Sequence, residues 1–100
     1  MPAVSRKGDT TTTGHICVST TTLDTPGQGT CYANSILIAR ITDPTVSHPY
    51  PPSPPCANHT STVKAGSATV FCEGKKVARV TDSADLGALT SGAGTVFAGG

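Results

Sequence analysis

Tryptophan, long apolar runs and helical periodicity are all missing from this chain of 100 residues. It contains two Phe, two Tyr and one Met, so its hydrophobic core must be thin, and a domain of this size then needs support from a disulfide, a metal or a partner. No stretch approaches the roughly 18 apolar residues of a membrane span, and the N-terminus has no apolar signal segment. We therefore expect one domain, residues 1–100, synthesised in the cytoplasm without a signal peptide.

Charge of either sign is also scarce. Seven Lys and Arg against six Asp and Glu give a net charge of +1, whereas nucleic acids and anionic membrane surfaces are bound by clustered Lys and Arg. The Gly-x-Ser-x-Gly motif of serine nucleophiles is absent, as is a phosphate-binding glycine loop before a helix. We expect no nucleic-acid partner, no enzyme activity and no small-molecule substrate.

The chain does contain one sequence motif that is repeated almost three times. Residues 27–43 and 66–82 align without a gap. The first part of the motif occurs again at residues 92–97, and its last part occurs at residues 4–9. Read as a cycle, the chain holds three units. A repeated supersecondary unit buries its apolar face against its copies, so the repeat predicts a fold with pseudo-threefold symmetry.

The residue pattern predicts an all-β fold. No window places apolar residues at helical spacing, and Thr, Val, Gly and Pro dominate. Hairpins are expected over 30–41 and 69–80, with turns at 33–35 and 73–75, and residues 95–98 would begin a third hairpin that stays incomplete. Between them we expect irregular segments, Thr-rich at 10–13 and 20–22 and a stiff polyproline-like loop at 49–55.

Each repeat also carries an Arg-x-x-Asp motif. An aspartate that recurs at one place in a turn accepts backbone N–H groups, so we interpret these carboxylates as structural rather than catalytic. The arginines could pair with the aspartates or contact a partner, and the sequence leaves both readings open. The three motifs are Arg6 to Asp9, Arg40 to Asp43 and Arg79 to Asp82.

Taken together, these motifs resemble PAAR-repeat proteins. The resemblance rests on Ala-Arg-Ile-Thr-Asp at 39–43, Ala-Arg-Val-Thr-Asp at 78–82, the N-terminal segment 2–9, Gly-His-x-Cys at 14–17 and the Gly-x-x-Thr-Val-Phe units, and it covers essentially the whole chain. Two departures stand out. The first copy reads Ala-Val-Ser-Arg in place of Pro-Ala-Ala-Arg, and two copies have Thr in place of Gly before Asp.

The resemblance implies a small cone of short hairpins whose base binds the blunt end of a trimeric β-helical spike and whose apex carries a metal. Family members tip the central spike of type VI secretion systems and contractile phage tails. This chain would be a bare tip without an effector extension, a monomer on a trimer, assembled into a phage tail or secreted with the spike, and meeting the target membrane only mechanically. The expected spike contacts are Val70, Phe71, Val96 and Phe97.

Three histidines in connecting segments predict the metal site. His15 and His48 follow the repeat aspartates by six and five residues, so the symmetry should bring them to one point. His59 ends a Cys-x-x-His motif, which lets one turn present a thiolate and an imidazole to one ion. We therefore expect structural zinc bound by His15, His48, His59 and Cys56, and the resemblance agrees, since family members bind zinc through three His and one Cys.

The fourth ligand is the open point, because the third repeat has no His or Cys after Asp82. Cys17, two residues after His15, is the alternative to Cys56. Cys31 and Cys72 fall within predicted strands and are expected to pack as buried thiols, since the histidines favour metal over disulfides. The rival function, an independent small zinc enzyme or zinc-binding protein, would need an open coordination position and a general base.

Overall fold

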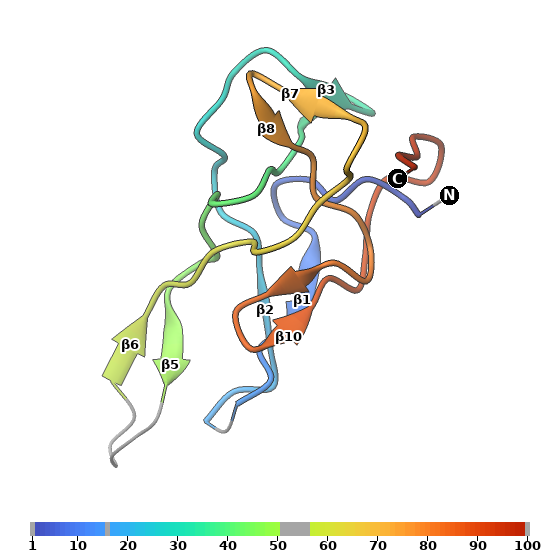
Figure 1. The fold of residues 1–100 in the computed structure, drawn as a ribbon. Helices are drawn as coiled ribbons and strands as arrows, with labels where there is room; N and C mark the ends of the chain where they lie inside the picture. The colour runs from blue at the N-terminus through green and yellow to red at the C-terminus, as the bar shows by residue number, and fades with distance from the viewer. Residues whose placement is uncertain (1, 16, 51–56, 100) are drawn as a thin grey trace.

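The structure, a computed structural model that describes residues 2–15, 17–50 and 57–99, consists of short antiparallel hairpins (Figure 1). This confirms the all-β prediction, and among the described residues no helix is long and apolar enough to cross a membrane. Five hairpins follow one another along the chain: β1 (Thr10–Thr12) with β2 (Thr20–Thr22), β3 (Tyr32–Ala33) with β4 (Ile36–Leu37), β5 (His48–Tyr50) with β6 (Ala57–His59), β7 (Phe71–Cys72) with β8 (Lys75–Lys76), and β9 (Ser83–Ala84) with β10 (Gly87–Ala88).

The two hairpins predicted from the repeat are present as β3–β4 and β7–β8. Their turns hold two residues rather than the three expected. Asn34 and Ser35 have φ values of 53° and 66°, and Glu73 and Gly74 have 50° and 82°. Positive φ at both central residues is what a two-residue turn needs to match the twist of its strands.

The prediction of irregular Thr-rich segments is wrong, because they pair as β1 and β2. Threonine is β-branched and suits a pleated strand, so these residues satisfy their backbone groups against each other. Pro49 also lies in a strand, opposite Asn58 in β5–β6. A two-stranded hairpin has only edge strands, which tolerate proline. Residues 51–55 of the predicted polyproline loop lie outside the described residues.

The third hairpin, expected to stay incomplete, is completed by the N-terminal segment. Ala3 pairs with Phe97, the Val4 N–H donates to the Val96 carbonyl at 3.0 Å, and the Ala98 N–H donates to the Pro2 carbonyl at 3.1 Å. The two ends of the chain therefore lie side by side (Figure 1). One repeat is split between them, which is why the sequence shows only half of it at each end.

A closed ring of backbone hydrogen bonds relates the three repeats. The Ala39 N–H donates to the Ser5 carbonyl at 3.1 Å, the Ala78 N–H to the Ala39 carbonyl at 2.9 Å, and the Ser5 N–H to the Ala78 carbonyl at 2.9 Å. Each of these buried residues precedes a repeat arginine. The ring makes the three repeats equivalent in their backbone pairing, as the cyclic reading of the sequence predicts.

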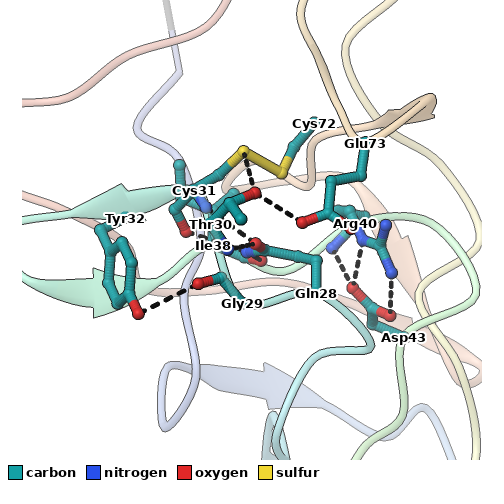
Figure 2. The surroundings of a disulfide bond; sticks show 10 residues. All are labelled: Gln28, Gly29, Thr30, Cys31, Tyr32, Ile38, Arg40, Asp43, Cys72 and Glu73. Carbon is teal, nitrogen blue, oxygen red and sulfur yellow. Dashed lines mark hydrogen bonds and ion pairs between the residues drawn. A yellow bond between two sulfur atoms is a disulfide. The ribbon is translucent and has the colours of Figure 1, made fainter.

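The Arg-x-x-Asp motifs form the same clamp three times. In the most buried one, the Arg40 N–H and Nε donate to Asp43 Oδ2 at 2.9 and 3.0 Å, and Nη2 donates to Oδ1 at 3.2 Å (Figure 2). The Asp43 N–H returns a bond to the Arg40 carbonyl at 3.1 Å. The other two motifs repeat these contacts. The arginines thus pair with the aspartates, and the carboxylates are structural turn residues.

The core divides into two small clusters of aliphatic and cysteine side chains. Leu23, Val63 and Leu89 lie in the first and occupy equivalent places, since each donates its N–H to the carbonyl of a repeat aspartate at 2.9 to 3.0 Å. The second cluster combines residues near the two ends of the chain with residues of the repeat unit 66–82. Its buried members are Val4, Cys72, Val77 and Ala98.

Cys31 and Cys72 form a disulfide (Figure 2), so the expectation that they pack as thiols is wrong. The bond joins the second repeat to the third across 41 positions of the chain, and constraining a loop of this size in the unfolded state is worth about 4 kcal/mol. The two cysteines occupy non-equivalent places in their repeats, because Cys31 aligns with Val70 and Cys72 with Ala33. Comparison of the repeats therefore does not reveal the pairing.

Replacing Thr81 by glycine should stabilise the fold. Gly8, Thr42 and Thr81 are the residues before the repeat aspartates, and their φ values are 85°, 73° and 80°. A β-branched residue is strained at such angles, so Thr81→Gly should raise the free energy of unfolding by about 1 kcal/mol after the entropy cost of glycine. Urea denaturation measures this. Thr60→Gly, at an exposed position without positive φ, should lower stability instead, and equal losses in both variants would contradict the strain.

Candidate metal centre

Three arms of the fold deliver side chains to one point. Each arm follows a repeat aspartate: β1–β2, β5–β6 and β9–β10. His15 lies between β1 and β2, His48 and His59 face each other in the register of β5–β6, and Asp85 lies in the turn between β9 and β10. The potential ligand atoms of these four residues all lie within 4.8 Å of one another.

The spacing of these atoms suits a tetrahedral ion. Asp85 Oδ2 lies 2.8, 2.7 and 3.5 Å from Nε2 of His15, His48 and His59. His48 Nε2 lies 3.3 Å from His15 Nε2 and 2.8 Å from His59 Nε2. Metal bonds of about 2.0–2.2 Å set tetrahedral ligands about 3.3 Å apart. These five distances bracket that value, and all the ligand atoms lie within 4.8 Å of one another, so the cluster could hold a metal ion.

The hydrogen bond at Nδ1 of His48 leaves its Nε2 atom available as a metal ligand. His48 Nδ1 lies 2.8 Å from the Val46 carbonyl, which can only accept, so Nδ1 carries the proton. In the neutral ring Nε2 then presents a lone pair, and it faces the Asp85 carboxylate at 2.7 Å. Two acceptors this close require a cation, either a proton or a metal ion. A backbone carbonyl behind a histidine ligand is the usual outer support of a metal site.

Asp85 is charged and enclosed. Burial raises the pKa of this carboxyl, but the side-chain contacts with His48 and His15 and the electrostatic effect of His15 and His59 together lower it by more, so the net pKa of Asp85 lies below its ordinary value. Its side chain is 3% exposed, whereas that of His59 is 26% exposed. A metal ligand must be deprotonated, and an ion can approach from the His59 side.

Two glycines let the first and third arms touch through their backbones. A Cβ on Gly14 would lie 2.0 Å from the Leu86 carbonyl oxygen, and one on Gly87 would lie 2.2 Å from the Thr12 carbonyl oxygen. Both distances are far below van der Waals contact, so no larger residue fits there without movement of the arms. This close approach brings the turn that carries the carboxylate against the loop that carries the first histidine.

The sequence predicts four metal ligands, and the structure describes three of them. The structure brings His15, His48 and His59 together, while Cys56 lies outside the described residues and remains a prediction. Cys17, the alternative, is disulfide-bonded and supplies no thiolate in this form. Sequence reasoning missed Asp85, although it follows Asp82 in the third repeat, where the symmetry required a ligand. The segment after Asp82 has no His or Cys, and an aspartate in a turn more commonly accepts backbone N–H groups.

The predicted spike-contact residues lie in the repeat units and not in the three arms. Phe71 is in β7 and Val70 precedes it, while Val96 and Phe97 pair with the N-terminal segment. Phe71, Phe97 and Val70 are 55, 48 and 40% exposed, whereas Val96 is partly buried against the second core cluster. Tyr32, which the sequence analysis did not single out, is 56% exposed. It aligns with Phe71 and Phe97 in the repeat, so every repeat exposes an aromatic side chain at the same place.

Comparison with protein-family models gives no match, and no curated protein matches the chain. What the chain does is therefore inferred from its residues and their geometry.

Proposed function

We propose that this chain is a spike tip of the PAAR-repeat type, which caps the blunt end of a trimeric β-helical spike in a contractile phage tail or type VI secretion system. The observation that carries the proposal is the closed hydrogen-bond ring of Ser5, Ala39 and Ala78. A single chain with three equivalent sides can present the same contacts to each subunit of a threefold partner. An asymmetric partner would leave two of the three sides unused.

The exposed aromatic residues give this surface its anchors. Tyr32, Phe71 and Phe97 occupy one position in three successive repeats. Large aromatic side chains are enriched in the buried centres of interfaces and carry much of their binding energy. We assign one aromatic residue to each spike subunit, with Val70 beside Phe71 as a further contact.

The metal is structural in this proposal, and the ion is Zn²⁺. Three imidazole nitrogens and one carboxylate oxygen at tetrahedral spacing are ordinary zinc ligands. Four protein ligands leave no position for an activated water, so the site holds three arms together and catalyses nothing. The described chain extends over 40 × 24 × 21 Å, with β5–β6 at one end and β3, β7 and β8 at the other (Figure 1). The spike would bind at the latter end and the metal-bearing arms would lead into the target envelope.

Binding to a spike tests the proposal. The purified chain is mixed with a purified homotrimeric β-helical spike protein and examined by size-exclusion chromatography with light scattering, where we expect one chain per three spike subunits. Phe71→Ser should weaken the complex about 30-fold, as loss of a central interface anchor does. Leu86→Ser is the matched control, because Leu86 is 58% exposed but lies in the β9–β10 turn. Absence of any complex would contradict the proposed function.

A further inference from the structure

We infer that the metal centre of this chain is built without a thiolate, from His15, His48, His59 and Asp85, and so retains its ion under oxidising conditions. The inference rests on the proposed structural zinc site and names its donor set. Two independent observations carry it: the state of the cysteines and the placement of Asp85.

The first observation is that every described cysteine is in a disulfide. Cys31 is bonded to Cys72, and Cys17 is disulfide-bonded as well. The metal ligand formed by cysteine is the thiolate, which a disulfide sulfur is not. Disulfides persist where the surroundings are oxidising. A chain that is stable in this form gains from a metal centre that does not depend on a reduced sulfur.

The second observation is that the backbone itself holds Asp85 at the cluster. Its φ of 54° places it in the left-handed region, which aspartate tolerates better than most residues. Its N–H donates to the Thr62 carbonyl at 3.2 Å, which joins the third arm to the second. The side chain is 3% exposed, and one oxygen, Oδ2, meets Nε2 of His15 and His48 at 2.8 and 2.7 Å. The carboxylate is thus a fixed member of the cluster.

Oxygen and nitrogen donors behave differently from sulfur towards oxidants. Hydrogen peroxide transfers one oxygen atom to a thiolate, giving a sulfenic acid and releasing hydroxide, and the ligand is lost. Carboxylate and imidazole groups do not undergo this step. A donor set of three nitrogens and one oxygen also favours Zn²⁺ and Co²⁺ over soft ions that select thiolates. Metal binding by the cluster should therefore not depend on the redox state of the cysteines.

Cobalt substitution of the full chain tests the donor set directly. With Co²⁺ in place of zinc, we expect the visible absorption of a tetrahedral site and no thiolate-to-cobalt charge-transfer band in the near ultraviolet. A charge-transfer band that disappears in Cys56→Ser would overturn the inference while leaving a structural metal in place. Because this spectrum is recorded on the unaltered chain, it does not depend on the folding of any variant.

Peroxide treatment tests the consequence. The wild-type chain should keep its full zinc content after exposure to hydrogen peroxide, whereas Asp85→Cys, which installs a thiolate at the same position, should lose most of its zinc. Asp85→Asn should bind zinc at least about 100-fold more weakly, beyond the 10- to 100-fold loss typical of outer-shell changes. Asp24→Asn, at an exposed aspartate, should change nothing.

The outcomes separate this inference from the proposed function. Zinc affinity that is unchanged in Asp85→Asn, or zinc loss from the peroxide-treated wild type, would overturn the donor set alone. A wild-type chain that binds no zinc in any form would overturn both the donor set and the structural-zinc part of the proposal. Capping of the spike is measured separately, by complex formation.

Discussion

Loading the metal-free chain with Zn²⁺ should raise its Tm by roughly 15–30 °C. At a free zinc concentration about 1,000 times Kd, the ligand contributes about 4 kcal/mol to stability, and each kcal/mol moves the Tm of a domain this size by about 4–8 °C. The ion would tie together the outer parts of three arms, whose strands contribute only Ala84 of β9 to the two small core clusters. Differential scanning calorimetry with and without a chelator measures the shift.

The variant His48→Ala decides whether this stabilisation comes from the proposed cluster. His48 contacts His15, His59 and Asp85, so its loss should abolish zinc binding and the zinc-dependent rise in Tm together. The exposed Asp24→Asn should retain both. A His48→Ala chain that still binds one zinc ion, or a wild-type chain that melts at the same temperature with and without zinc, would contradict the site.

Removing Asp43 should strongly destabilise the fold, by roughly 3–5 kcal/mol for Asp43→Ala. Arg40 and Asp43 are each 4% exposed, and breaking a buried ion pair by deleting one partner leaves the other charge without compensation. Denaturant unfolding measures the loss. Asp9→Ala is the matched control, because the Arg6 and Asp9 side chains are 16 and 11% exposed and solvent can replace the lost contact. Equal losses at both positions would contradict the dependence on burial.

The same clamp predicts a decline of stability in acid. Burial raises the pKa of Asp43, but hydrogen bonds from the Arg40 side chain, the Gly27 N–H and the Arg40 N–H, together with the charge of Arg40, lower it by more, so the net pKa lies below its ordinary value. A carboxyl with a depressed pKa stabilises the fold above its unfolded pKa, and this contribution is lost as the pH falls through the folded value. The free energy of unfolding should therefore decrease as the pH drops below about 4. The decrease should be less steep in Asp43→Asn.

Local signals in the repeat are enough to predict the hairpins β3–β4 and β7–β8. Their turn residues and β-forming neighbours lie within a dozen positions of each other, so the pattern and the structure concern the same short segment. The β1–β2 hairpin was missed because a run of threonine has no alternation of polar and apolar residues to indicate a strand. Completion of the third hairpin by residues 2–4 was missed because its two strands are at opposite ends of the chain.

The ligands of the metal cluster also divide into those that the sequence indicates and one that only the structure reveals. Spacing from the repeat aspartates was enough to select His15 and His48, because equivalent positions converge on a common axis, and the Cys-x-x-His motif selected His59. Asp85 obeys the same rule but was overlooked, since an aspartate in a turn is ordinarily a backbone-bonding residue. The contacts of Asp85 Oδ2 with the histidine nitrogens distinguish it from the turn aspartates.

The repeated motif alone dictates three equivalent units, short hairpins and the placement of histidines between them, because these properties depend on residue types at short, regular spacing. Long-range contacts dictate the rest: the pairing of Cys31 with Cys72, the strand that closes the third hairpin and the carboxylate that meets the histidines. Such contacts depend on where the backbone places residues that are distant in the sequence, for example at Gly14 and Gly87. The spacing of residues along the chain does not reveal how close they lie in space.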